Sequence, residues 1–370
     1  MTRALVARLD SDGDVLISGP TVRAVAAGVD EVVLLVGPRG AAAAHLLPGV
    51  DRILTWSCPW IEHDPQPVDA ASTERLVADL RDLDLDRALV LTSYHQSPLP
   101  LALLLRLAGV PWIGAVSEDY PGALLDLRHR LPDTGLHEVE RQLSLAEAAG
   151  LPLPDRDDGS LQVRRPLPDL SALTGNAPYV VVHPGSAVPA RAPSPDWAAA
   201  LVRALAAAGH RVVVTGGPSE TALSADVAGD VAVDIGGRTD FAGLADVLDR
   251  ADVVVAGNTG PAHLAAAVAT PVVSLFAPVV PAERWRPWRV AHVLLGDQSA
   301  PCAGTRARTC PLPSHTCLDT VAIAAVLDAV RELTPRTARS AARRAAPAPD
   351  AAAAARASPR SAAARRTAVP

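Results

Sequence analysis

The sequence contains no lysine, and all 34 of its basic residues are arginine. Schiff-base catalysis and the ordinary phosphate-binding P-loop both need a lysine amine, so these two classes are excluded. Aromatic residues make up only 3% of the chain, whereas hydrophobic residues make up 49%. These proportions predict a globular protein with an aliphatic core. The formal net charge of −6 does not favour a protein that binds nucleic acid.

Long apolar runs are also lacking. No segment approaches the roughly 18 uninterrupted apolar residues of a membrane span. The amino-terminal stretch MTRALVARLDSDGD does not have a cationic segment followed by an apolar one, so no secretory signal is predicted. We therefore expect a cytoplasmic protein, and its 370 residues are enough for two domains.

Cysteine is scarce, and three of the four cysteines lie close together in the sequence: Cys302, Cys310 and Cys317. His315 lies among them, but the spacings differ from the Cys-x-x-Cys pairs of a zinc site. Reduced thiols that hold a loop fit a cytosolic protein better than a structural metal. No metal site and no cofactor are predicted.

The most informative stretch, residues 252–278, reads as a strand, a tight turn, a helix and a second strand. The turn from Gly257 to Gly260 consists of small residues that let the backbone approach a ligand. Pro261 suits the first helical turn, and His263 lies beside it. Because the N–H groups at a helix start after a parallel strand attract anions, the stretch is a candidate phosphate site.

The run GNTGPAHLAAAVATPVVSLFAP in this stretch is similar to the signature of the heptosyltransferase family, the family-9 glycosyltransferases of the two-domain GT-B type. The resemblance extends over most of residues 1–330. It implies an α/β fold with two doubly wound Rossmann-like domains facing a cleft. It also implies that this turn and helix hold the diphosphate of a nucleotide sugar. Many members have Asp where this chain has Asn258, so that contact is expected to be a neutral hydrogen bond.

The predicted organisation has five parts. Residues 1–160 form an acceptor-binding domain, 161–177 a linker, and 178–318 a donor-binding domain. Residues 319–334 form a helix that crosses back to the first domain. The Ala-, Pro- and Arg-rich residues 335–370 are predicted to be a disordered tail. This tail either binds an anionic membrane surface peripherally or is an inert extension.

Asp14 is the predicted catalytic residue. The segment RLDSDGDVLISGPTVRAV resembles the family's opening motif, in which a Gly-Asp pair supplies the general base. Asp14 occupies the matching position at the end of a first strand, before a helix expected over residues 15–27. A simple helix N-cap is the alternative interpretation of its carboxylate.

Further along the first domain, a polar cluster at residues 92–97 follows a predicted strand. His95 and Gln96 are the candidate acceptor-binding residues there, although a helix start would explain the cluster equally well. The segment LHEVERQLSLAEAAGLPLP resembles the one that precedes the family's interdomain linker. Its His137 and Arg141 are four residues apart on one helix face. They either point into the cleft or pair with surface acids, and pairing at the surface is the expectation.

Several second-domain residues match the family's donor-binding positions. Arg191 would neutralise donor phosphate through bidentate contacts, unless it is an ordinary loop arginine. Glu220 would hold the ribose hydroxyls, or would only complement a helix dipole. Helix capping alone would explain Thr239 and Asp240. Trp285 and Trp288, in the connection after residue 278, either close the donor cleft or cover core. The full set predicted to bind the donor is Ser186, Arg191, Gly216, Gly217, Glu220, Arg238, Thr239, Asn258, Thr259, Gly260 and His263.

The sequence thus predicts an inverting, metal-independent glycosyltransferase. It would move heptose or a related sugar from a nucleotide diphosphate, ADP-heptose above all, to a glycan, glycolipid or other hydroxyl acceptor of the cell envelope, such as lipopolysaccharide. Two alternatives remain open: an epimerase or hydrolase of sugar nucleotides, and a non-catalytic protein that binds them. Release of free sugar or epimer without acceptor would favour the first alternative, and tight binding without turnover the second.

Overall fold

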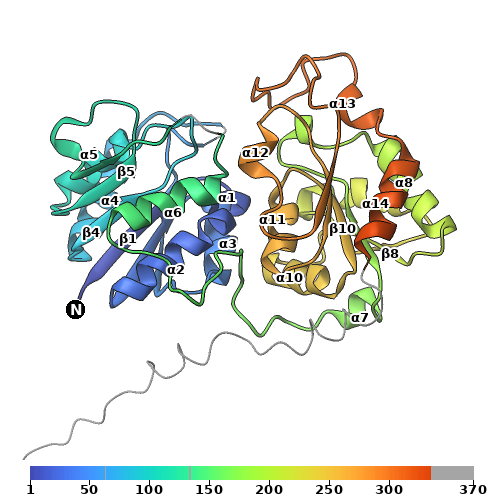
Figure 1. Cartoon of the computed structure of the whole chain (residues 1–370), viewed down its shortest axis with the longest axis horizontal. Helices are drawn as coiled ribbons and strands as arrows, with labels where there is room; N and C mark the ends of the chain where they lie inside the picture. The colour runs from blue at the N-terminus through green and yellow to red at the C-terminus, as the bar shows by residue number, and fades with distance from the viewer. Residues whose placement is uncertain (63, 133–134, 335–370) are drawn as a thin grey trace, which may run out of the picture.

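The computed structural model describes residues 1–62, 64–132 and 135–334, which form two α/β domains (Figure 1). Each domain contains one six-stranded sheet in which every pairing is parallel. The first domain contains β1 (Arg3–Arg8), α1 (Asp12–Ile17), α2 (Gly19–Gly28), β2 (Glu31–Val36), η1 (Pro38–Gly40), α3 (Ala41–Leu46), β3 (Arg52–Thr55), α4 (Ala70–Asp82), β4 (Arg87–Val90), α5 (Leu99–Leu107), β5 (Ile113–Val116), η2 (Gly122–Leu124), β6 (Leu127–His129) and α6 (Glu138–Ala148).

A long connection holding the single-turn α7 (Ser171–Thr174) leads to the second domain. That domain contains β7 (Val180–His183), η3 (Pro189–Arg191), α8 (Pro195–Ala207), β8 (Val212–Val214), η4 (Pro218–Glu220), α9 (Thr221–Ala228), β9 (Val233–Asp234), α10 (Phe241–Arg250), β10 (Val253–Gly257), α11 (Gly260–Ala267), β11 (Val272–Leu275), α12 (Ala282–Trp285), β12 (His292–Leu295), α13 (Thr316–Asp319) and α14 (Ile323–Leu333).

Both sheets have the same strand order. The first runs β3-β2-β1-β4-β5-β6, and the second runs β9-β8-β7-β10-β11-β12. In each, the order reverses between two central strands, β1 and β4 or β7 and β10. This is the doubly wound arrangement, which places ligands at the carboxyl ends of the strands beside the reversal. The predicted fold class is confirmed.

The strands form because their sequences are nearly continuous apolar runs, as expected for parallel strands buried on both faces. Strand β10, VVVAG, is buried along its whole length. The side chains pack into three apolar clusters, two of which cover the outer faces of the two sheets. The third is continuous between the domains and includes residues of α1, α2, α3 and α6 as well as of α10 and α11. The inner helical layers of the two domains thus share one core.

The first predicted helix differs from the structure. Residues 15–27 were expected to form one helix, but the chain forms α1 and α2, divided at Ser18. Pro20 explains the division because its nitrogen carries no hydrogen to continue the hydrogen-bond ladder. Helix α1 begins at Asp12 with Ser11 at the N-cap position. Asp14 therefore lies inside the first turn and is not an N-cap.

The domain boundaries also differ in detail. Leu161 and Val163 are buried in the shared core, and Arg164 Nε donates to the Leu47 carbonyl at 2.8 Å, so this part of the expected linker packs on the first domain. The expected crossing-back helix does not return to the first domain. Its apolar face, with Val326 and Val330 at 0% exposure, packs into the second domain's outer cluster (Figure 1).

The predicted disordered tail, residues 335–370, lies outside the described residues. Within the part of the chain that the structure describes, no helix is long and apolar enough to cross a membrane.

Candidate active site

Arg8, the last residue of β1, is the centre of the first-domain half of the site. Its side chain is fully buried, with Nε 3.1 Å from Asp10 Oδ2 and Nη2 3.0 Å from Asp14 Oδ1. Nη2 also donates to Ser93 Oγ at 2.8 Å. One buried guanidinium thus connects the ends of β1 and β4 with the start of α1, at the point where the strand order reverses.

The Asp14 carboxylate is held as an anion. Ser11 Oγ donates to Asp14 Oδ2 at 2.9 Å. Burial favours the protonated carboxyl, but Arg8, Ser11 and, from the second domain, His263 and Arg191 outweigh it and lower the pKa of Asp14 below its usual value. Asp14 can therefore accept a proton, and its side chain keeps 21% of its surface exposed.

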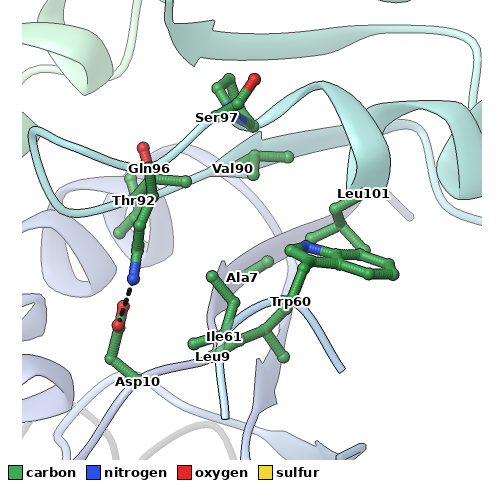
Figure 2. Close-up of a pocket in the computed structure, with 12 residues that line it drawn as sticks. Ala7, Leu9, Asp10, Trp60, Ile61, Val90, Thr92, Gln96, Ser97 and Leu101 are labelled. Atoms are coloured by element: carbon green, nitrogen blue, oxygen red, sulfur yellow. Dashed lines mark hydrogen bonds between the residues drawn. The ribbon is translucent and has the colours of Figure 1, made fainter. Parts of the chain in front are cut away.

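Gln96 supports Asp10. Its Nε2 donates to Asp10 Oδ1 at 2.7 Å (Figure 2). Its Oε1 accepts from the Ser93 backbone N–H at 3.0 Å. The cavity lined by Gln96, Asp10 and Trp60 measures about 10 Å³, room for roughly one water molecule. Of the two predicted acceptor-binding residues, Gln96 is thus already engaged within the first domain. The side chain of His95 is exposed beside it.

The start of α6 forms another wall of the site. Arg141 Nη1 donates to the Thr92 carbonyl at 2.8 Å, and His137 Nδ1 accepts from the Val139 N–H at 3.2 Å. Both side chains are buried, so the expected pairing with surface acids does not occur. Glu138 is 0% exposed, and within the described chain its oxygens have no hydrogen-bond partner. Burial raises the pKa of Glu138, while Arg8 and Arg141 oppose that change.

The second-domain half is built on the turn between β10 and α11. Thr259 occupies the N-cap position of α11, and Gly260 and Pro261 open its first turn. Asn258 does not face this turn with its amide. Its Oδ1 accepts from the Ala277 N–H at 3.1 Å, and its Nδ2 donates to the Ala277 carbonyl at 3.3 Å. Asn258 therefore ties the turn to the end of β11, and the hydrogen bond expected from it to a donor is already made within the protein.

Arg191 lies beside this turn, at the end of η3. A Cβ added to Gly257 would lie 2.3 Å from the Arg191 carbonyl oxygen, so only glycine lets the two segments approach. Arg191 Nε is buried and has no hydrogen-bond partner among the described residues. Burial lowers the pKa of Arg191, whereas Asp14 raises it. An unpaired cation beside a helix N-terminus is suited to binding phosphate.

His263 completes this group from the first turn of α11. It is 5% exposed, and within the described chain its Nδ1 has no hydrogen-bond partner. Burial lowers its pKa to about 4, with Asp14 opposing and Arg191 adding to the effect. Ser186 is less available than predicted because its Oγ accepts the Val188 N–H at 3.0 Å.

The remaining donor candidates line the neighbouring strand ends. Glu220 Oε2 accepts from the Gly217 N–H at 2.7 Å and lies 3.7 Å from His183 Nε2. The next turn is connected to this one because the Gly237 N–H donates to the Gly216 carbonyl at 2.9 Å. In that second turn the side chain of Arg238 is exposed and that of Thr239 is half-buried. The N-cap of α10 is Asp240, whose carboxylate accepts the Gly243 N–H. These residues form a continuous edge from β10 across β7 and β8 to β9.

The two domains touch at several points. Helix α1 packs against α11, and the α12 segment packs on the first domain (Figure 1). His137 Nε2 lies 2.9 Å from the Arg286 carbonyl, and its ring stacks on Trp288 at 4.5 Å. Trp285 packs edge-on against Tyr94 at 5.7 Å. Trp288 is therefore interdomain core, and Trp285 also lies at the domain contact.

The structure thus places the first turn of α1, with Asp14, against Gly260 and His263, and Arg191 lies beside the turn before α11, at Gly257. Glu220, Arg238 and Thr239 lie further along the second sheet. Sequence reasoning missed Arg8 and Glu138. An arginine at the carboxyl end of the apolar strand RALVAR was a usable signal for Arg8. For Glu138 no local signal existed.

The cysteine segment holds no metal cluster within the described residues. Cys302 and Cys317 are buried in the outer apolar cluster of the second domain, and all four cysteines are free.

The chain resembles known proteins both in sequence and in fold. Residues 73–315 match the model of glycosyltransferase family 9 (heptosyltransferase). Lipopolysaccharide heptosyltransferase 3 of Escherichia coli K12 is 30% identical over 173 residues, which cover 43% of this chain. The chain spans about half the length of this curated relative, 49%.

Two solved structures share the fold. The family-9 glycosyltransferase from Veillonella parvula superposes with a TM-score of 0.72 at 15% identity, over 90% of this chain and 97% of that one. E. coli heptosyltransferase WaaC with ADP-2-deoxy-2-fluoro heptose superposes with a TM-score of 0.66 at 19% identity, over 90% and 99%. Because the family model covers more than half of the sequence, the chain belongs to glycosyltransferase family 9, the heptosyltransferase family.

Proposed function

We propose that the protein transfers a sugar from a nucleotide diphosphate to a hydroxyl group of an acceptor. One observation carries this proposal: the first turn of α1, which holds Asp14, lies against the first turn of α11, which holds His263, so that a Cβ added to Gly13 would lie 3.0 Å from His263 Cδ2. A base and a set of anion-binding groups at one point are what a glycosyl transfer with a diphosphate leaving group needs. Membership of glycosyltransferase family 9 supports the same reaction class.

In the proposed reaction, Asp14 takes the proton of the acceptor hydroxyl as its oxygen bonds to the anomeric carbon. The bond from that carbon to the diphosphate oxygen breaks at the same time, and the diphosphate leaves with the bonding electrons. Attack from the face opposite the leaving group inverts the anomeric configuration. Arg191 and the start of α11 stabilise the charge that develops on the diphosphate, so the proposal requires no metal.

The donor is proposed to be ADP-heptose or a close relative. A protein of the same fold was solved with ADP-2-deoxy-2-fluoro heptose, which supports an adenine nucleotide. The diphosphate would lie at Arg191 and α11, and the nucleoside along the edge toward Glu220 and Arg238. The acceptor is proposed to be an envelope glycan or glycolipid. It would enter over His95, which lies in the loop after β4, the first-domain strand next to β1.

The test combines binding and turnover. Calorimetry with ADP, GDP and UDP should detect selective binding of one diphosphate, which Arg191→Gln weakens. Transfer to candidate acceptors, followed by mass spectrometry and anomeric NMR, should give an inverted product. Asp14→Asn should reduce the rate by about 10²- to 10⁴-fold. Free sugar or an epimer formed without acceptor would indicate a hydrolase or epimerase instead, and binding without any turnover a non-catalytic protein.

A further inference from the structure

The loop that carries Arg191 can make few backbone hydrogen bonds of its own. Prolines occupy three nearby positions, Pro189, Pro193 and Pro195, and a proline nitrogen has no hydrogen to donate. Within η3 the Arg191 N–H donates to the Val188 carbonyl at 2.8 Å. Because backbone polar groups need partners, the rest of this loop has to be held by segments elsewhere in the chain.

One segment, residues 308–321, holds both chain neighbours of this arginine. On one side, the Ala190 N–H donates to the Arg308 carbonyl at 2.9 Å. On the other side, His315 Nδ1 lies 3.0 Å from the Ala192 carbonyl oxygen. A carbonyl oxygen can only accept, so this ring nitrogen is the donor and carries the hydrogen. We call residues 308–321 the supporting segment.

The supporting segment also binds the start of α8, which follows the same loop. The Ser194 N–H donates to Asp319 Oδ1 at 2.8 Å, and Trp197 Nε1 donates to the Val321 carbonyl at 3.0 Å. The segment is itself anchored, because Cys317 is buried in the outer apolar cluster of the second domain. This cysteine acts there as a small apolar side chain. The loop is therefore bonded to a fixed part of the domain.

The position of Arg191 matters because the arginine lies directly beside the turn before α11. A Cβ added to Gly257 would lie 2.3 Å from the Arg191 carbonyl oxygen, so the two backbones are in contact. Charge-assisted hydrogen bonds to phosphate need distances of about 2.7–2.9 Å. A small displacement of the loop would therefore weaken the contact between the guanidinium and a diphosphate bound at this turn.

We propose that His315 is a positioning residue of the donor site: its hydrogen bond to the Ala192 carbonyl holds Arg191 where the diphosphate binds. The inference rests on the proposed function and adds to it a residue that acts on the donor through Arg191. Of the two bonds beside the arginine, the one from His315 is made by a side chain, so a substitution can remove it.

The experiment measures ADP binding by calorimetry on the full chain, with thermal melts to show that each variant is folded. His315→Ala should weaken ADP binding about fivefold, the equivalent of one hydrogen bond. His315→Gln should weaken it similarly, because its amide lies nearer the place of Nε2 than of Nδ1. His315→Asn should restore most of the affinity, because its amide nitrogen lies close to the place of Nδ1 and can donate to the same carbonyl.

His292→Ala is the matched control. His292 Nδ1 lies 2.9 Å from the Val290 carbonyl, so the variant removes the same kind of bond, but on the edge strand β12 and away from η3. Its affinity for ADP should equal that of wild type. If His315→Ala and His315→Gln bind ADP like wild type, or if His315→Asn binds no better than they do, the inference is wrong.

A double-variant cycle distinguishes positioning from a general loss of structure. In the Arg191→Gln background, His315→Ala should have almost no further effect on ADP affinity, because the side chain that His315 positions is gone. Equal losses in both backgrounds would show that His315 acts independently of Arg191, which would overturn the inference and leave the transferase proposal intact. Absence of ADP, GDP and UDP binding to the wild type would instead refute the proposed function and, with it, this inference.

Discussion

Arg8 Nη2 lies 3.0 Å from Asp14 Oδ1, and this contact joins the fully buried end of β1 to α1, the helix that packs against α11 of the second domain. The guanidinium also pairs with Asp10, so two carboxylates depend on one cation. The site's proposed base is therefore fixed from inside the first domain, before any substrate contacts it.

Arg8→Gln should be strongly destabilising. It leaves two carboxylates near the core without their cation, and breaking such a buried ion pair costs about 3–5 kcal/mol of unfolding free energy. Urea denaturation would measure this loss. Arg75→Gln is the control, because Arg75 and Asp69 form a pair 3.9 Å apart with 69% and 65% of their side chains exposed. That change should cost no more than about 1 kcal/mol. Equal losses for both variants would contradict the role given to Arg8.

Asp12→Asn should change how stability depends on pH. Burial raises the pKa of Asp12 to about 6, although its Oδ1 accepts the Ala43 N–H at 2.9 Å. The folded protein therefore holds this proton more tightly than the unfolded chain, and ionisation of Asp12 removes stability as the pH rises from about 4 to 7. Asparagine cannot ionise, so the variant should gain on wild type over that range, by on the order of 1 kcal/mol. Thermal melts at pH 4.5, 5.5 and 7 would test this, and a constant difference would contradict it.

Gly13→Ala should separate α1 from α11. The new methyl would lie 3.0 Å from His263 Cδ2, so the two first turns must move apart. Because the base would then be misplaced, we expect transfer to slow on the order of 10- to 100-fold with the fold retained. Gly19→Ala is the control, since its methyl meets the flexible ends of two side chains, Leu47 at 3.2 Å and Arg23 at 3.8 Å. Steady-state rates of both variants would decide, and equal rates would show that the contact is not needed.

His137→Ala should loosen the domain contact in a pH-dependent way. It removes the hydrogen bond to the Arg286 carbonyl, at a cost of about 1–3 kcal/mol at pH 7. Burial lowers the pKa of His137 to about 3, below its unfolded value of roughly 6.5. Between those values only the unfolded chain takes up the proton, so His137 contributes less stability at pH 5 than at pH 7. The cost of the substitution should therefore shrink as the pH falls. His45→Ala, on the exposed face of α3, is the control for denaturant unfolding at both pH values.

Most of the fold could be predicted from the sequence because its signals are local. Runs such as the VVVAG of β10 indicate buried parallel strands, and Gly260 with Pro261 marks the start of α11. The place of Asp14 just after the first strand was expected from the resemblance of RLDSDGDVLISGPTVRAV to the family's opening motif, although the helix there begins earlier than expected, at Asp12. Those features need only neighbouring residues to be recognised.

The missed features depend on contacts between distant segments. Arg8 meets Ser93, which lies 85 residues away, and no periodicity reveals such a pair. Asn258 has a side chain that could bind a ligand, yet its amide forms hydrogen bonds with the backbone of Ala277, which follows the next strand. Helix α14 was expected on the first domain, but an amphipathic pattern specifies only that one face is covered and not which neighbour covers it.

The apolar cluster shared by α1, α2, α3 and α6 with α10 and α11 has a consequence for folding. Removing either half would expose a broad apolar surface, so neither half is self-sufficient as a folding unit. The chain should unfold in one cooperative calorimetric transition rather than two. A destabilising substitution in the sheet of one domain should therefore lower the melting temperature of both domains together.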